Sequence, residues 1–365
     1  MTRTMSWTAW AVGTVALASM AMPALAADIP AALKPVITAA RQEARLDVTN
    51  SPNVAGLPDG IQDAQAALHR LYGVDITINF SPAPSPTAAI TKLFTEYQAG
   101  VPASTDFFTV AAPAMAPYAD KTMFQSVPWA EYMPGRITPD IVEANGQALR
   151  METQLPGILY NIKAAPWVEQ VNNLDDLLKP EYKGKFATNP FLAGIDVLLS
   201  PEKWGVEKTT AYVRKFAPQV SGIIRCGGAE ARVATGEFPA FALDCVGGDQ
   251  NMLKFRGKDI IDTKIIGDAA QRRYLYMAVP ARARHPNAAI LFALYLSSPE
   301  GQSLLAAHDG ADLDSYADSL NGKRVKAAEA KGIKFVDVSI DWWQKQPKES
   351  MAAIGQIVKI LDQQH

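Results

Sequence analysis

The chain has 365 residues, of which 48% are hydrophobic and 20% are charged, and it contains 24 glycines and 25 prolines. This apolar content is enough for a large buried core, so it excludes a disordered or collagen-like chain. The 35 basic and 37 acidic residues give a formal net charge of −2. This balance excludes the strong positive field that concentrates nucleic acid or anionic lipid.

The N-terminal 26 residues have the pattern of a secretory signal peptide. Arg3 is their only charge, an apolar stretch runs from Trp7 to Met22, and Ala24 and Ala26 are the small residues that a signal peptidase reads. We expect cleavage after Ala26. An uncleaved membrane anchor is the alternative, which the many small residues of the stretch disfavour. No later stretch is long and apolar enough to span a bilayer, so we expect a soluble protein in an oxidising compartment.

Helix-type and strand-type patterns alternate in the first part of the mature chain. Apolar residues recur at helical spacing in four segments, which we expect to be helices: residues 31–44, 60–72, 87–99 and 115–119. Short buried or alternating runs predict strands at residues 46–49, 75–80 and 107–110. This alternation favours a parallel sheet covered by helices.

A second series of the same kind begins after residues 155–162. Its strands are predicted at residues 185–188, 220–225, 239–244 and 274–279. Its helices, together with those of the C-terminal region, are predicted at residues 173–178, 205–216, 229–235, 286–296, 299–307 and 341–361. The expected fold class is therefore α/β, with two units that each have a core.

The sequence contains two cysteines, Cys226 and Cys245, which lie 19 positions apart. An even number of cysteines in an exported protein predicts a disulfide, and neither residue lies in a Cys-x-x-Cys redox motif. Two buried free thiols or a reactive pair are the alternatives. If the strands before the two cysteines are neighbours, the disulfide would brace two loops at the same edge of a sheet.

The usual signatures of enzymes are absent from the sequence. There is no Gly-x-Ser-x-Gly, Gly-x-Gly-x-x-Gly or Gly-Lys-Ser/Thr motif, and none of the four histidines starts a His-Glu-x-x-His pair. We therefore expect a protein that is not an enzyme and that has no cofactor. A catalytic site assembled from scattered residues is the alternative.

Several short motifs occur in order along the chain. Residues 159–161 read Leu-Tyr-Asn, and residues 174–185 contain the stretch DLLKPEYKGK. Residues 232–237 read RVATGE, and the stretch HPNAA at residues 285–289 is followed by LSSPEGQ at residues 296–302. These motifs resemble those of the extracellular solute-binding proteins of bacterial ABC importers, in the branch that includes ferric-ion, polyamine, thiamine and sugar-phosphate binders. They are mostly fold elements, so they indicate the scaffold and not its ligand.

This resemblance implies a two-lobed α/β fold of the type II periplasmic binding class. Each lobe would have a mostly parallel sheet flanked by helices, and crossover strands would join the lobes. We expect residues 27–153 and 274–365 to form lobe one and residues 154–273 to form lobe two. The resemblance also implies a periplasmic protein, expected to be a monomer, that binds a small solute between the lobes and delivers it unaltered to an ABC permease in the inner membrane.

Ligands of open α/β sheets bind beyond the carboxyl ends of the strands. The loops expected at these ends contain polar residues and glycines that we take as candidate ligand-binding residues: Ser51, Asn53, Ser81, Ser85, Thr109, Asn189, Gly227, Gly228, Asp244, Asp249 and Arg273. Backbone N–H groups at such loops and helix N-termini favour a carboxylate or phosphate group. The alternative is that the serines and asparagines only cap helices and form turns.

The charges near the expected site give some guidance about the ligand. Arg272 and Arg273 adjoin the predicted crossover strand and would suit an anion, unless they form a solvated surface pair. Asp244 and Asp249 would instead suit an amine or a metal ion. The helix-terminus loops favour an anion, so we lean towards a small organic acid or a phosphorylated compound, with a polyamine-type cation next.

A ferric or other metal ion is the remaining alternative. In the ferric branch of the family, a Tyr-Tyr pair follows the Gly-Glu end of a helix, and its phenolates bind the cation. The corresponding segment of this chain, residues 238–248, contains no tyrosine, which argues against ferric binding by that route. Tyr274 and Tyr276 lie further on, in the predicted crossover strand. Alternation places both on one face of that strand, where core or hinge packing is the expected role.

Overall fold

The structure is a computed structural model, and it describes residues 29–51, 54–83, 85–226, 228–245, 260–317 and 319–364. The predicted signal peptide and its cleavage site after Ala26 lie outside the described residues, as do the candidate residues Asn53, Gly227 and Asp249. Within the described ranges, no helix combines the length and the apolar character that crossing a membrane requires.

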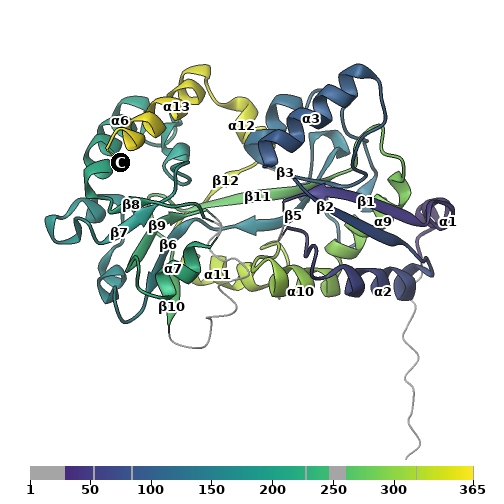
Figure 1. Cartoon of the computed structure of the whole chain (residues 1–365), viewed down its shortest axis with the longest axis horizontal. Coiled ribbons are helices and arrows are strands. Elements are labelled where there is room, and N and C mark those ends of the chain that lie inside the picture. Colours follow the sequence, from purple (N-terminus) through teal and green to yellow (C-terminus); the bar gives the residue numbers. More distant parts are fainter. Residues whose placement is uncertain are drawn as a thin grey trace, which may run out of the picture.

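The first lobe is built on short parallel strands with helices on their faces (Figure 1). Strand β1 pairs in parallel with β2, and a parallel bridge between Val48 and Phe107 joins β1 to the start of β3. The strands and covering helices are β1 (Arg45–Asn50), β2 (Thr77–Pro82), β3 (Phe108–Ala111), α1 (Lys34–Glu43), α2 (Ile61–Tyr72), α3 (Pro86–Ala99), α4 (Ala112–Met115), α5 (Trp129–Tyr132), α9 (Pro286–Ser297) and α10 (Pro299–His308). Glycines at positive φ end α2 and α3, because this conformation is strained for residues with a side chain.

The second lobe contains a five-stranded sheet in the order β10-β6-β9-β7-β8. Strand β7 pairs in parallel with both β8 and β9. Strand β6 pairs antiparallel with β9 on one side and with the edge strand β10 on the other. The elements are β6 (Gly157–Asn161), β7 (Phe186–Thr188), β8 (Gly222–Ile223), β9 (Ala240–Asp244), β10 (Ile261–Lys264), α6 (Gly205–Phe216) and α7 (Ala229–Ala234).

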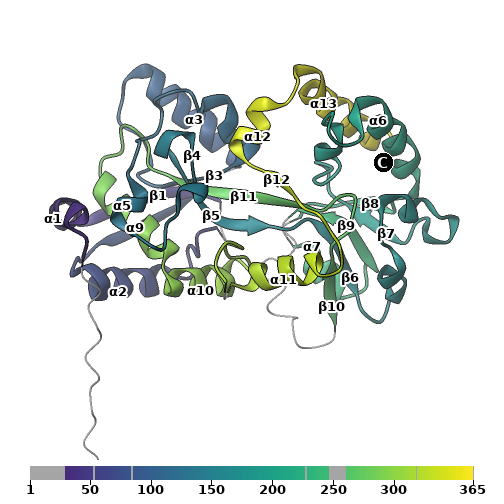
Figure 2. The ribbon, with the colours of Figure 1, turned by 180° about the vertical axis from the view of Figure 1, so that it is seen from behind.

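Long strands run between the two lobes through the middle of the molecule (Figure 2). They belong to a sheet in the order β12-β11-β5-β4, and β3 of the first lobe pairs with β11. The remaining elements of this region are β4 (Val142–Glu143), β5 (Ala148–Gln154), β11 (Gln271–Ala278), α11 (Leu320–Glu329) and β12 (Val336–Val338). Strand β5 continues directly into β6 of the second lobe, and β10 leads back to β11. These connections join the two lobes, and we call them the hinge.

Short 3₁₀ helices fill many of the connections. They are η1 (Ala31–Leu33), η2 (Ala116–Tyr118), η3 (Pro139–Ile141), η4 (Ala144–Gly146), η5 (Pro166–Gln170), η6 (Leu174–Leu178), η7 (Pro180–Tyr182), η8 (Asp196–Leu199) and η9 (Ala217–Gln219). The predicted helix at residues 173–178 is therefore a 3₁₀ helix. It begins with a capping box in which Asn173 and Asp176 exchange hydrogen bonds with each other's backbone N–H.

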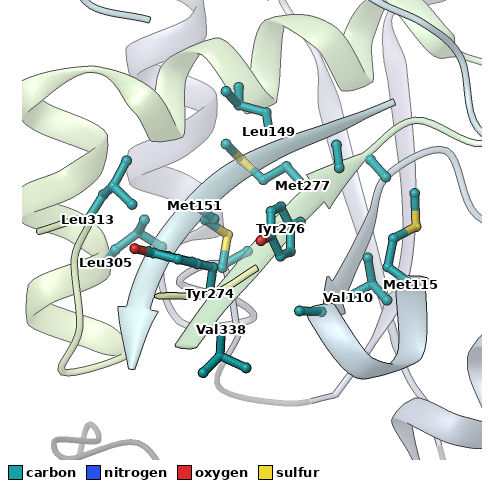
Figure 3. Close-up of a cluster of buried hydrophobic side chains, with 14 of the residues drawn as sticks. Val110, Met115, Leu149, Met151, Tyr274, Tyr276, Met277, Leu305, Leu313 and Val338 are labelled. Atoms are coloured by element: carbon teal, nitrogen blue, oxygen red, sulfur yellow. The ribbon is translucent and has the colours of Figure 1, made fainter. Parts of the chain in front are cut away.

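The crossover strand β11 carries its two tyrosines into the core (Figure 3). Tyr274 and Tyr276 are 2% and 0% exposed, and their hydroxyls donate to Asp337 and Glu143 over 2.9 and 2.8 Å. Burial raises the pKa of both phenols, which opposes the ionisation that a phenolate metal ligand requires. The expected packing role of the two tyrosines is confirmed.

The C-terminal region differs from its prediction. The prediction of a single helix at residues 341–361 is wrong, because the chain forms two helices there, α12 (Ile340–Lys345) and α13 (Lys348–Asp362). Pro347 separates them, since a proline lacks the N–H of a helix interior and pushes the preceding residue into extended backbone. Helix α13 then packs against α6 of the second lobe, although we expected the whole of residues 274–365 to lie in the first.

Candidate ligand-binding site

The carboxyl ends of β1 and β2 in the first lobe point towards the second lobe (Figure 1). Asn50, the last residue of β1, is 5% exposed, and its Nδ2 donates to Thr109 Oγ1 over 2.5 Å. Asn50 also accepts hydrogen bonds from the backbone N–H groups of Ser51 and Ala83, both at 2.8 Å. Asn50 thus ties the carboxyl ends of β1 and β2 to β3. The predicted candidate Thr109 is 6% exposed, and its hydroxyl oxygen accepts the hydrogen bond from Asn50.

The three serine candidates of the first lobe differ in position. Ser51 is half-buried directly after β1. Ser81 is exposed within β2, which extends two residues further than predicted. Ser85 is the N-cap of α3, and its hydroxyl oxygen accepts from Ala88 N over 3.1 Å. Its side chain therefore caps the helix, while the first turn of α3 contains no acidic residue that would oppose an anion at this end.

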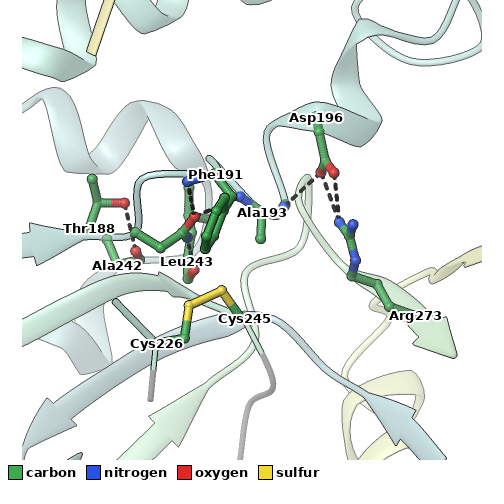
Figure 4. Close-up of a disulfide and its surroundings, with 11 residues drawn as sticks. Thr188, Phe191, Ala193, Asp196, Cys226, Ala242, Leu243, Cys245 and Arg273 are labelled. Atoms are coloured by element: carbon green, nitrogen blue, oxygen red, sulfur yellow. Dashed lines mark hydrogen bonds and ion pairs between the residues drawn. A yellow bond between two sulfur atoms is a disulfide. The ribbon is translucent and has the colours of Figure 1, made fainter. Parts of the chain in front are cut away.

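In the second lobe, Asn189 follows β7 and is fully buried. Its Nδ2 donates to the carbonyl of Leu243 over 2.5 Å, and its Oδ1 accepts from the N–H groups of Phe191 and Ala193 (Figure 4). The side chain of Asn189 therefore fixes the shape of the loop that follows β7. This loop presents the ring of Phe191, which is 57% exposed and was not among the predicted candidates.

Arg273 joins the second lobe to the crossover strand β11 (Figure 4). Its Nη1 lies 2.9 and 2.8 Å from the two carboxylate oxygens of Asp196 in η8, and 3.1 Å from Gln271 Oε1. Asp196 Oδ1 also accepts from the N–H groups of Gly194 and Val197. The guanidinium that we expected to meet an anion is thus engaged by a carboxylate, and the pair spans the hinge.

The predicted disulfide between Cys226 and Cys245 is present, with a Cα–Cα distance of 5.9 Å. The strands before the two cysteines, β8 and β9, are not neighbours, because β7 lies between them. The disulfide therefore spans the carboxyl end of β7, next to the loop that Asn189 fixes (Figure 4). It ties together two of the loops at this edge of the sheet.

Two further candidates also lie at this edge. Gly228 precedes α7 at a φ of +86°, with no atom within 4 Å of the position that a Cβ would take. Asp244 ends β9 and is fully buried. The carboxylate of Asp244 is therefore not exposed to a ligand cation in this structure.

The described residues contain one group of three potential metal ligands, formed by Asp47, Asp106 and His285. Its carboxylates already accept hydrogen bonds from within the lobe. Asp106 accepts from the N–H groups of Asp47, Arg284 and His285 and from the His285 ring, at distances of 2.7 to 3.0 Å. The group connects β1 and the segment before β3 to the start of α9, so it has a structural explanation.

Two α/β lobes with strand ends directed towards crossover strands define a binding protein of the type II class. Residues 61–333 match the family model described as bacterial extracellular solute-binding protein. The chain therefore belongs to this family, and the family and fold predicted from the sequence motifs are confirmed. No curated protein sequence matches the chain significantly.

Solved structures with the same fold bind chemically different ligands. The chain is similar to the spermidine/putrescine substrate-binding protein PotD of Streptococcus pneumoniae, with a TM-score of 0.60, 15% identity and coverage of 88% of this chain and 99% of that one. AfuA of Actinobacillus pleuropneumoniae, with fructose-6-phosphate bound, has a TM-score of 0.63 and 14% identity, and the match covers 87% of this chain and 98% of AfuA. Iron-bound HitA of Pseudomonas aeruginosa has a TM-score of 0.59 and 14% identity, and the match covers 88% of this chain and 99% of HitA. At these identities the likeness shows the fold alone.

Proposed function

We propose that this chain is the periplasmic solute-binding protein of an ABC importer, and that it captures a small polar solute between its lobes and delivers it to a permease in the inner membrane. The observation that carries the proposal is that strand ends of both lobes are directed towards the hinge formed by β5 and β11. Closure of two lobes about a hinge needs no covalent step, since ligand contacts that form only in the closed state stabilise that state.

The lobes of this proposal are residues 27–153 with 274–365, and residues 154–273, with α13 bracing the second lobe. The site would lie between the rim that contains Ser51, Ser81 and Ser85 and the rim that contains Phe191 and Gly228. Asn50, Asn189 and the disulfide hold these rims in shape. Rims that are already ordered lose less conformational entropy when a ligand binds. Binding as a monomer requires no residue from a second copy.

The ligand class that we propose is a small organic acid or a phosphorylated compound. The acidic side chains that would attract a cation are not free at the described rims, because Asp244 is fully buried and Asp196 is paired with Arg273. The 14-residue helix α3 begins at the rim of the first lobe with no acidic residue in its first turn. The positive end of its dipole favours an anion there. Among the described rim residues, Asp196 and Asp244 therefore offer a polyamine or a metal ion no free carboxylate.

A thermal-shift screen of the mature protein, starting at Ala27, tests this proposal. The probes are citrate, fructose-6-phosphate, spermidine and ferric citrate, each compared with sodium chloride at equal ionic strength. A true ligand at 100 times its dissociation constant should stabilise the protein by about 2.7 kcal/mol. Stabilisation by an organic acid or a sugar phosphate is the expected result, whereas stabilisation by spermidine alone would contradict the ligand class.

The same preparation separates a binding protein from an enzyme. The bound probe is released by denaturing the complex and is identified by mass spectrometry. We expect it to be recovered unaltered after prolonged incubation with the protein. Catalytic turnover of the probe would contradict transport as the function, whatever the affinity.

A further inference from the structure

A pocket of about 1080 Å³ lies away from the rims described above, and residues of the edge strand β10 of the second lobe and of helix α11 line it. Figure 2 shows where these two elements lie in the fold. One wall comes from β6, β10 and the loops beside them. The other wall comes from α11 and the segment that leads to β12. No residue that lines this pocket is among the candidate ligand-binding residues. The proposed solute site does not account for it.

The charged side chains that line this pocket are mostly basic. Lys264 lies on the wall of the second lobe, and Arg324, Lys331 and Lys334 lie on the wall formed by α11 and the following segment. Two acids, Glu169 and Asp262, also line it. The carboxylate of Glu169 already accepts a hydrogen bond from the hydroxyl of Tyr160. The lining therefore has four cationic and two acidic groups.

In the described part of the chain, no lysine of this pocket forms a salt bridge. There, the ion pairs formed by lysines involve Lys92, Lys179 and Lys345. Lys264 donates only to a backbone carbonyl, that of Glu169. Burial is the main reason that the pKa of Lys264 is lowered; the charges of Glu169 and Asp176 oppose this shift, and the charge of Lys331 adds to it. An anion in the pocket would favour the charged form of Lys264.

The two walls are attached to different parts of the hinge. Helix α11 is tied to the end of β5, because Asn321 Nδ2 donates to the carbonyl of Thr153 over 2.6 Å. Asn321 N also donates to Asp312 over 2.8 Å. The opposite wall belongs to the sheet of the second lobe, and a hydrogen bond of 2.8 Å from Arg324 to Thr263 connects the walls. A rotation of the second lobe about the hinge therefore changes the distance between Lys264 and the lysines of the other wall.

We propose that this pocket is a second anion-binding site, which holds a small multivalent anion with phosphate or carboxylate groups between Lys264 on one wall and Lys331 and Lys334 on the other. A multivalent anion suits the pocket because its charges can reach cations on both walls at once. This site is separate from the proposed solute site, and its existence does not depend on the identity of the transported solute.

Isothermal titration calorimetry of the mature protein with inorganic pyrophosphate and with citrate, at constant ionic strength, tests the proposal. Saturable binding of either probe is expected, and the tighter probe identifies phosphate or carboxylate as the preferred group. Both Lys264→Gln and the pair Lys331→Gln/Lys334→Gln should weaken this binding by about tenfold or more, because each removes charged hydrogen-bond donors.

The matched control is the pair Lys323→Gln/Lys326→Gln, which removes the same charge from exposed positions of α11 that do not line the pocket. We expect it to change the affinity by no more than about twofold, as screened surface charges do. The proposal would be overturned by the absence of saturable binding of either probe, by an equal loss of affinity in the control, or by a loss confined to the variant of one wall. Binding that survives both pocket variants would also overturn it and would place the anion elsewhere.

Discussion

The ion pair between Asp196 and Arg273 allows the sharpest test of how the hinge is stabilised. The side chains of this pair are 8% and 14% exposed. Replacing Asp196 with Ala removes the acceptor of the N–H groups of Gly194 and Val197 and leaves the guanidinium with Gln271 alone. Because breaking a buried pair from one side leaves the other charge uncompensated, we expect Asp196→Ala to lower the free energy of unfolding by about 3–5 kcal/mol.

Removing the arginine of the pair should lower the free energy of unfolding by less than removing the aspartate. In Arg273→Met the carboxylate of Asp196 keeps both backbone donors, so the loss is that of the charged hydrogen bonds to the guanidinium, about 1.5–3 kcal/mol. The double variant should cost less than the sum of the two single variants, because the two residues share one interaction. The structure thus predicts an order of stability among the three variants as well as a magnitude.

Urea unfolding of the mature protein, followed by far-UV circular dichroism, measures these changes. Glu237→Ala is the matched control, since the pair of Arg232 and Glu237 also lies in the second lobe but its side chains are 41% and 49% exposed. We expect the control to change stability far less. Equal costs for Asp196→Ala and Arg273→Met, or an effect of Asp196→Ala no larger than that of the control, would refute the reasoning.

Two further predictions concern the disulfide and a carboxylate of the first lobe. Replacing Cys226 and Cys245 with Ser should lower the free energy of unfolding by about 3 kcal/mol, since it opens a short loop; unchanged stability in urea unfolding would contradict this. Burial acts to raise the pKa of Asp47, but hydrogen bonds from Arg45 and Asn79 outweigh burial, and the pKa is lowered from 3.8. The stabilisation by ionised Asp47 is therefore present above about pH 4 and is lost as the pH falls through the folded-state pKa. The stability difference between the wild type and Asp47→Asn should thus shrink on acidification, and a difference that grows in acid would contradict the assignment.

The elements that could be predicted from the sequence are those whose pattern is local. Helices α2, α6 and α9 each bury one face or lie fully inside the core, and their periodicity is visible without knowledge of their partners. Strand β5 was missed for the opposite reason. It buries polar residues such as Glu152 and Thr153, and its Arg150 is compensated by Glu143 and by the ring of Tyr274. The apolar alternation of this strand is limited to Leu149 and Met151, and its main pairing partner, β11, comes from a distant segment.

For the candidate site, too, the sequence could not show the contacts that single residues make with other parts of the folded chain. Asn189 and Asp244 lie at the carboxyl ends of β7 and β9, as the strand-end rule predicts, whereas Thr109 is the second residue of β3. Their contact with a ligand stays a prediction. The sequence could not show that the polar atoms of Asn189 are taken up by its own loop. Nor could it show that Arg273 meets Asp196 across the hinge. Both depend on backbone positions that only the folded chain defines.

Hydrogen–deuterium exchange of the mature protein with and without the tightest hit of the thermal-shift screen tests the central claim most directly. If a solute binds between the lobes, peptides that contain Ser51 and Ser81 in the first lobe and peptides that contain Phe191 in the second should become protected together. Protection confined to one lobe, or to the pocket beside α11, would contradict binding between the lobes.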